Sequence, residues 1–253
     1  MDLGLKGKKA IILGGSRGIG RFTAELMRRE GASVAICARG AEGVEEARAA
    51  LQAMGEGTVF AQAADLEDGE ATKAFVRAAI EALGGVDILV HNASGFDMEG
   101  DEAGWERSFR VDMMAGVVAV EEAIPALEES DSASITFVGS MASGYFFGRR
   151  SSYGPAKAAM RAYANDLAQS LGRRGIRANA ISPGAVHFPG GSWDTRKIEN
   201  PDFYAKVEKA IPLGRLGTGE EIARIIGFVS SPAGMWINST HIVADGGQVA
   251  AVD

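Results

Sequence analysis

Tyr153 and Lys157 are spaced as an acid–base pair on a helix would be. Side chains four residues apart lie on one helix face, so the phenol and the ammonium would be neighbours. A nearby cation favours the phenolate, so the pair predicts a Tyr153 pKa lowered toward the range of an acid–base catalyst. Ser140 lies 13 residues upstream, where its hydroxyl could hydrogen-bond the same substrate oxygen. Exposed Tyr and Lys side chains also pair by chance, so this spacing alone leaves both interpretations open.

A glycine-rich turn is the second chemical feature. The apolar run over 8–13 is typical of a buried strand, and residues 19–29 have the periodicity of a helix. Glycines between two such elements let backbone N–H groups approach a phosphate, and the dipole of the following helix favours the anion. Glycines also serve ordinary turns, which is the alternative here. We predict a nucleotide-binding turn formed by Gly14, Ser16, Arg17, Gly18, Ile19 and Gly20.

The elements that must position these residues alternate along the chain. Strand patterns cover 8–13, 32–38, 58–63, 86–91, 133–139, 176–181 and 241–244. Helical patterns cover 19–29, 42–54, 68–83, 101–128, 153–173 and 219–230. Such alternation implies parallel strands joined by right-handed crossovers. We therefore expect an α/β fold: one Rossmann-type domain over residues 1–253, with a doubly wound parallel sheet of about seven strands and helices on both faces.

Polar residues and turn residues follow several of the expected strands. Asp65, Asn92 and Ser140 each come directly after a strand, and Pro183 and Gly184 follow another. Each of these residue types also suits an ordinary turn or cap. Because the carboxyl ends of parallel strands meet at one edge of the sheet, their joint occurrence favours a shared site.

Composition excludes several classes of protein. The 253 residues suffice for one large domain, and 26 Lys and Arg against 33 Asp and Glu give a net charge of −7, which argues against a nucleic-acid surface. The single Cys37 cannot form an intrachain disulfide. No leader pattern and no run of 18 apolar residues is present, so we expect a cytoplasmic protein without a membrane segment.

The chain resembles the short-chain dehydrogenase/reductase family from Lys6 to about Gln248. The matching stretches are Gly14 to Gly20, His91 to Ser94, Ser140, Tyr153 with Lys157, Ser182 to Gly184, and Asp245 to Gly247. Within that family it is most similar to the 3-oxoacyl-carrier-protein-reductase-like members. The stretches that carry this closer similarity are Ile211 to Arg215 and Glu220 to Ala223.

The resemblance implies hydride transfer between a nicotinamide and a ketone or secondary alcohol. Tyr153 would donate or remove the proton, Ser140 would hold the substrate oxygen, and Lys157 would bind the nicotinamide ribose and lower the pKa of Tyr153. Other cofactor contacts would come from Asn92 at a ribose, Asp65 and Leu66 at the adenine, and Pro183, Gly184 and Val186 at the carboxamide. No metal is implied.

Some residues depart from the family pattern. Leu13 stands where Thr is common, while His91 and Ser94 replace an Asn and a Gly. Asp112 occupies the place of the Asn that completes the catalytic set. In relatives the main-chain carbonyl of that Asn holds a water in the proton relay from Lys, and this contact would survive the change to Asp. The added carboxylate could instead act on Lys157 or Tyr153 electrostatically, so both roles of Asp112 stay open.

Substrate identity is open at this stage. Residues 186–211 correspond to the family's substrate lid, and their turn followed by aromatic residues suits a closing flap. Aromatic residues at 96, 145–147, 193, 203 and 204 either line the pocket mouth or pack the lid and a subunit contact. A pocket lined by them would fit a compact apolar or cyclic ketone at least as well as a polar thioester. Arg149, Arg150, Arg173 and Arg174 could instead dock a carrier protein, as in a 3-oxoacyl reductase of fatty-acid synthesis. A catalytically silent nucleotide-binding regulator is a third alternative, against which the intact Ser140, Tyr153 and Lys157 argue.

Residues near the end of the second strand predict the cofactor. Enzymes that prefer NAD usually carry an acid there, and Ala38 stands in its place. Arg39 follows, and Arg17 lies in the glycine turn, so two guanidinium groups could bind a 2′-phosphate. Arg39 could also be a solvated loop residue. We expect NADP(H) in preference to NAD(H).

Small residues predict the assembly. The helices expected at 101–128 and 153–173 are rich in Ala and Gly, which permit close helix contacts. In relatives these two helices meet about a two-fold axis, so we expect a homotetramer that acts on a small-molecule substrate and binds neither nucleic acid nor membrane.

Overall fold

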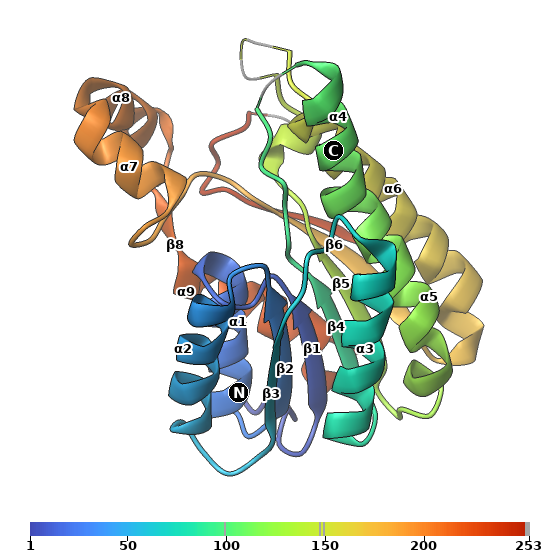
Figure 1. Cartoon of the computed structure of the whole chain (residues 1–253). Coiled ribbons are helices and arrows are strands. Elements are labelled where there is room, and N and C mark those ends of the chain that lie inside the picture. Colours follow the sequence, from blue (N-terminus) through green and yellow to red (C-terminus); the bar gives the residue numbers. More distant parts are fainter. Residues whose placement is uncertain (99, 147, 149, 251–253) are drawn as a thin grey trace.

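A parallel sheet of seven strands forms the centre of the molecule in the computed structural model, which describes residues 1–250 except 99, 147 and 149 (Figure 1). In spatial order the strands are β3 (Val59–Ala63), β2 (Ser33–Ala38), β1 (Lys9–Leu13), β4 (Ile88–His91), β5 (Ser134–Val138), β6 (Arg177–Pro183) and β9 (His241–Ala244). The winding reverses between β1 and β4, which is where such sheets bind ligands. The predicted fold class is confirmed.

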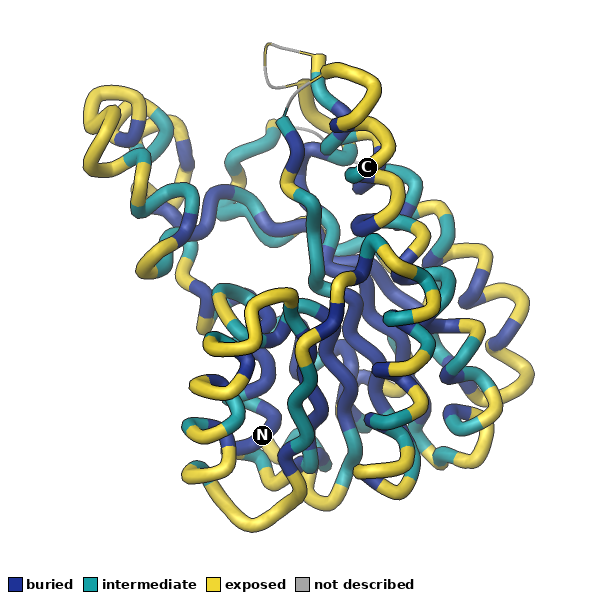
Figure 2. The backbone as a smooth tube through the Cα atoms, viewed as in Figure 1, coloured by how far each residue is buried: buried dark blue, intermediate teal, exposed yellow. Residues whose placement is uncertain are grey.

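Helices cover both faces of this sheet. One layer consists of α1 (Gly18–Arg29), α2 (Ala41–Gln52) and α9 (Gly219–Ser230); the other consists of α3 (Gly69–Leu83), α5 (Ala115–Leu127) and α6 (Tyr153–Leu171). In β1, Ile12 packs against the first layer and Ile11 against the second, and both are fully buried. Burial on both faces explains why the strands are continuous apolar runs (Figure 2).

The prediction of one long helix over 101–128 is wrong in one respect. The segment consists of α4 (Glu102–Ser108), a π-helix (Phe109–Met114) and α5, and Pro125 lies inside α5. The wider turn of the π-helix brings Val111 and Asp112 into the interior. Hydrophobic periodicity could not predict this, because it follows the average repeat of a helix and not a single widened turn.

The segment predicted as a lid stands away from the sheet (Figure 1). It contains β7 (Val186–His187), α7 (Ser192–Glu199) and α8 (Pro201–Ala210), and β7 pairs in parallel with β8 (Gly217–Thr218). Tyr204 and Ile211 form a small core of their own with Leu216 and Ala185. The two helices were not resolved by the sequence patterns, because each is short and mostly polar.

Short 3-10 turns complete the described chain at η2 (Met141–Ser143), η3 (Gly172–Arg174) and η4 (Pro232–Gly234). Within the described residues, no helix combines the length and the apolar character needed to cross a membrane.

Candidate functional site

A cavity of about 600 Å³ opens at the carboxyl ends of the strands. The predicted site residues that line it are Gly14, Ser16, Arg17, Gly18, Ile19, Arg39, Asp65, Leu66, Asn92, Ser140, Tyr153, Lys157, Pro183, Gly184 and Val186. Gly20 and Asp112 do not line it. The fold thus brings together residues that are far apart in sequence, as the strand-end argument predicts.

Gly20 does not line the cavity, but its lack of a side chain allows close packing beneath the cavity wall. A Cβ at this position would lie 2.2 Å from the Gly14 carbonyl oxygen and 2.5 Å from Nδ2 of Asn92. That amide nitrogen donates to the Gly14 carbonyl at 2.8 Å, which ties the end of β4 to the end of β1. Gly20 therefore lets α1 begin directly against the turn.

The glycine turn presents the start of α1 to the cavity. Gly14 has a φ of 78°, and the N–H groups of Gly14 and Gly15 donate to the Cys37 carbonyl at 3.0 Å. Arg17, the N-cap residue, gives α1 no side-chain cap. The first N–H groups of the helix are therefore available to an anion, as at other phosphate-binding helix starts.

Two exposed arginines border the same end of the cavity. Arg17 and Arg39 both line it, and among the described residues no ion pair engages either guanidinium. Ala38 also lines the wall, so no carboxylate stands at the end of β2. Asp65 accepts a hydrogen bond from the Glu67 N–H at 3.1 Å and stabilises the turn after β3. This end of the cavity suits a ligand with a further negative charge.

Tyr153, Ser140 and Lys157 meet at the other end. Ser140 follows β5 and accepts the Ala142 N–H at 3.1 Å, and its side chain hydrogen-bonds that of Tyr153. Lys157 lies one turn after Tyr153 on α6, with its Nζ 5.8 Å from the centre of the phenol ring. Only 2% of Lys157 is exposed, and Nζ donates to the Val138 carbonyl at 3.0 Å. The three side chains are arranged to polarise one oxygen and exchange one proton with it.

The expected lowering of the Tyr153 pKa is wrong in its net direction. Burial raises the pKa of Tyr153 above its ordinary value, and this outweighs the lowering by Lys157 and by the hydrogen bond from Ser140. The charge of Asp112 raises the pKa further. Sequence spacing identified the cation, but desolvation and the second charge depend on the tertiary structure.

Asp112 lies behind the cavity in the π-helix and is fully buried. Its Oδ1 is 2.9 Å from Nζ of Lys157, and its Oδ2 accepts the Gly95 N–H at 3.0 Å. Its main-chain carbonyl lies 2.9 Å from Nε2 of His91. Two of the departures from the family pattern, His91 and Asp112, are thus in direct contact.

His91 ends β4 and is almost completely buried. Burial, followed by the charge of Lys157, lowers the pKa of His91 to about 4. The ring is therefore neutral near pH 7, and its Nε2–H donates to the Asp112 carbonyl. Nδ1 is buried without a hydrogen-bond partner among the described residues. Sequence reasoning noted His91 only as a deviation; its position at a strand end was the signal for a site residue.

Aromatic side chains form the mouth beside Tyr153. Phe96 lines the cavity with its ring edge-on to Tyr153 at 5.3 Å, and its φ of 47° is unusual for a residue other than glycine. Trp193 of α7 also lines the cavity, and so does Phe188, whose ring lies against Gly18 at the start of α1. Sequence reasoning missed Phe188, although Gly18 and Gly191 pack against its ring.

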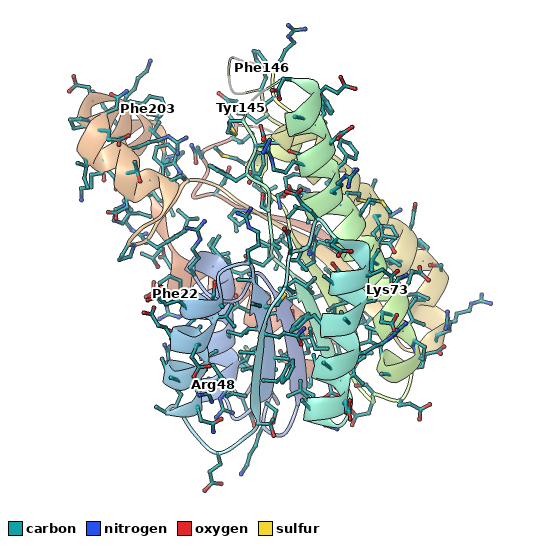
Figure 3. All side chains as sticks on the ribbon, in the orientation of Figure 1. Phe22, Arg48, Lys73, Tyr145, Phe146 and Phe203 are labelled. Carbon is teal, nitrogen blue, oxygen red and sulfur yellow. The ribbon has the colours of Figure 1, made fainter. Side chains whose placement is uncertain are left out.

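Other aromatic residues considered for the mouth lie elsewhere. Phe203 stacks on Trp193 at 5.9 Å but does not line the cavity (Figure 3). Tyr145 and Phe146 are exposed at the top of the molecule in Figure 3, apart from the lid helix that carries Phe203. Phe147 falls outside the described residues. Tyr204 packs in the small core of the lid. Only part of the aromatic set can therefore contact a substrate in this arrangement.

The described part of the chain contains no cluster of three His, Cys, Asp or Glu side chains that could hold a metal ion.

Comparisons with known proteins agree with this geometry. A family model described as enoyl-(acyl carrier protein) reductase matches residues 14–248. The chain is 36% identical to the isoepoxydon dehydrogenase of Penicillium expansum, over 98% of this chain and 96% of that protein. It is 34% identical to the rhamnolipids biosynthesis 3-oxoacyl-[acyl-carrier-protein] reductase of Pseudomonas aeruginosa, over 96% of each. The structure of L-sorbose reductase from Gluconobacter frateurii, complexed with NADPH and L-sorbose, superimposes with a TM-score of 0.92 at 26% identity and full coverage of both chains.

His91 makes stability depend on pH. Its pKa is about 4 in the folded state and about 6.5 when unfolded, so between these values the unfolded chain binds more protons. Stability therefore falls as the pH falls through this window. We expect His91→Gln, whose amide can still donate to the Asp112 carbonyl, to lose less stability on acidification than the unmodified protein. Urea unfolding of both proteins at pH 7 and near pH 5 measures this; equal losses of free energy would contradict the assignment.

Proposed function

Since the chain belongs to the short-chain dehydrogenase/reductase family, we propose that it is an NADP(H)-dependent oxidoreductase that transfers a hydride between the nicotinamide and a ketone or secondary alcohol. The observation that carries the proposal is the convergence of Ser140, Tyr153 and Lys157 at one end of a single cavity, with a phosphate-binding turn at its other end. The general class, an oxidoreductase of this family, rests on the relatives; the cofactor and the mechanism are our inference.

The residues present fit a dinucleotide. The uncapped start of α1 and the close approach allowed by Gly20 suit a pyrophosphate, and Arg17 with Arg39 suits a further phosphate. When bound, the cofactor would supply or accept the hydride. Other proposed contacts are with Gly14, Ser16, Gly18, Ile19, Asp65, Leu66, Asn92, Tyr153, Lys157, Pro183, Gly184 and Val186.

Tyr153 is the proposed proton donor in reduction and the proton acceptor in oxidation. Its raised pKa keeps the phenol protonated near neutral pH, which suits donation to a carbonyl oxygen. Ser140 would hold the same oxygen, and Lys157 would orient the ribose and stabilise the phenolate left after transfer. Asp112 joins the set as a residue acting through Lys157.

A compact apolar or cyclic ketone, or the matching alcohol, is the substrate class we favour. Phe96, whose ring lies against Tyr153, and Trp193 give the cavity wall an apolar surface. The isoepoxydon dehydrogenase supports a small free substrate. Residues 186–211 would cover it as a lid, because α7 contributes Trp193 and Ser192 to the cavity wall.

A carrier-protein-dependent 3-oxoacyl reductase is the alternative. The relative from Pseudomonas aeruginosa that bears this name favours it. Against it, Arg173 and Arg174 follow the end of α6 and come 16 or more residues after Lys157, so they lie about 24 Å along the helix from the cavity wall. Arg174 also pairs with Glu128, and Arg149 falls outside the described residues.

We expect Tyr153→Phe to lower kcat by about 10²- to 10⁴-fold while leaving NADPH affinity nearly unchanged, because only the ionisable hydroxyl is removed. The matched control is Tyr163→Phe on the same helix, since Tyr163 does not line the cavity. Turnover of a cyclic ketone and of a carrier-linked 3-oxoacyl thioester should be measured for each variant. Activity of Tyr153→Phe near that of the control would refute the mechanism; activity on the thioester alone would replace the substrate class.

We expect the unmodified protein to use NADPH with a higher kcat/KM than NADH. The NADPH in the L-sorbose reductase structure supports this preference. Arg39→Ala should lower kcat/KM with NADPH by about 10- to 100-fold and leave NADH nearly unaffected, because a charge-assisted contact is lost. Ala38→Asp should move the preference toward NADH, and Arg48→Ala, outside the cavity, is the control. Equal efficiency with both cofactors in the unmodified protein would show that the arginines do not read the phosphate.

The homotetramer and the cytoplasmic location remain predictions. Part of the argument from small residues needs correction, because Ala115, Ala119, Ala156 and Ala164 are buried within the described monomer. The exposed Trp105 and Phe109, stacked at 6.0 Å beside α5, are better candidates for a subunit contact.

Light scattering at micromolar concentration should give four times the chain mass of 26.4 kDa. Phe109→Glu should shift the protein toward smaller species, because it places a charge in the proposed contact. A monomer mass for the unmodified protein would contradict the tetramer.

A further inference from the structure

We propose that Lys157 is held in its working position by the carboxylate of Asp112, while the main-chain carbonyl of Asp112 is reserved for His91. The proposal rests on the proposed function, because it concerns the lysine that orients the cofactor and acts on Tyr153. It makes Asp112 a positioning residue whose side chain is required, although the residue does not line the cavity.

The ion pair between Asp112 and Lys157 is buried on both sides. Asp112 is 0% exposed and Lys157 is 2% exposed, with 2.9 Å between Oδ1 and Nζ. In such an environment neither charge is screened by water, so removing one partner leaves the other uncompensated. The pair therefore constrains Lys157 much more strongly than a surface salt bridge would.

The donors of Lys157 can be counted. An ammonium group has three N–H donors. Val138 accepts one of them at 3.0 Å, and Asp112 Oδ1 lies within ion-pair distance at 2.9 Å without accepting a hydrogen bond, so two donors remain for the cavity that Lys157 lines. A hydrogen bond to β5 and an ion pair with the π-helix thus hold Nζ from two different elements.

The main-chain carbonyl of Asp112 already has a donor. The neutral ring of His91 donates Nε2–H to it at 2.9 Å. A carbonyl oxygen has two lone pairs, so a relay through it, which the family resemblance implies, would have only the lone pair that His91 leaves. The carboxylate provides the contact to Lys157 instead.

The same carboxylate reaches the loop that carries Phe96. Its Oδ2 accepts the Gly95 N–H at 3.0 Å, and Phe96 follows with its positive φ and its ring against Tyr153. An Asn side chain is uncharged and has a single oxygen, so it cannot accept from the Gly95 N–H and also form an ion pair with Lys157, as the two carboxylate oxygens do. Asp112 therefore contacts both Lys157 and the loop whose Phe96 ring lies at the mouth of the cavity.

The decisive comparison is between Asp112→Asn and Asp112→Glu. We expect Asp112→Asn to lower kcat by about 10- to 100-fold, because a charged contact to Lys157 is lost. The charges acting on Tyr153 are Lys157 on α6 and Asp112 in the π-helix, and His91 on β4 is neutral above about pH 4. Removing the Asp112 charge lowers the Tyr153 pKa. Reduction needs the protonated phenol, so the alkaline fall in activity should move to lower pH in Asp112→Asn.

Asp112→Glu keeps the charge and changes the shape. Its alkaline limb should stay close to that of the unmodified protein, even where the longer side chain lowers kcat. A shift in both variants, or in neither, would overturn the proposal, because the charge of the Asp112 carboxylate would then not be what acts on Lys157 and Tyr153. If Asp112→Asn keeps kcat within twofold, the carboxylate is not required; a Tyr153→Phe variant that is still inactive would show that the proposed function nevertheless stands. Circular dichroism and NADPH affinity confirm that each variant is folded.

The role of His91 is tested by adding His91→Asn to Asp112→Asn. The shorter side chain should release the carbonyl, so the double variant should regain at least part of the kcat lost in Asp112→Asn. Non-additivity of this kind is expected for residues in contact. A double variant no more active than Asp112→Asn would show that His91 does not withhold the carbonyl, and this part of the proposal would fall.

Discussion

The buried ammonium of Lys157 is the point at which the elements of the site are joined. It contacts the end of β5 through Val138 and the π-helix through Asp112, and it lies one turn from Tyr153 on α6. A cation with 2% exposure is stable only where acceptors and a counter-charge surround it. The site is therefore rigid at its reacting end, because displacing any one of these elements would leave a buried charge without a partner.

The opposite end of the cavity is held by close backbone approach and not by charge. Gly20 allows α1 to start against the Gly14 carbonyl, and Asn92 ties that carbonyl to the end of β4. The arginines beside this turn are exposed, as suits groups that bind a ligand phosphate from solvent. Between the two ends, the lid helices contribute Trp193 while standing off the sheet (Figure 1). A lid separate from the two fixed ends of the cavity suits a site that must admit both a cofactor and a substrate.

Electrostatics at Tyr153 illustrate how local and tertiary effects compete. The helical spacing of Lys157 is a local fact, and its lowering of the Tyr153 pKa follows from it. Burial and the charge of Asp112 act in the opposite sense and prevail. The phenol is protonated near neutral pH even at its ordinary pKa, so the charge of Asp112 affects how readily Tyr153 releases its proton and not whether it carries one.

Sequence patterns were sufficient for the sheet, the glycine turn and most of the cavity wall. Strands buried on both faces read as apolar runs, so β9 (His241–Ala244) and α9 (Gly219–Ser230) begin and end where expected. The position of Asn92, Ser140 and Pro183 at strand ends was enough to place them together. Hydrophobic periodicity could not predict the π-helix, the pairing of β7 with β8, or the fact that Phe203 does not line the cavity. These features depend on contacts between distant segments. The same reason applies to Asp112: its type was visible in the sequence, but its ion pair with Lys157 and its contact with His91, 21 residues away, exist only because the fold brings these residues together.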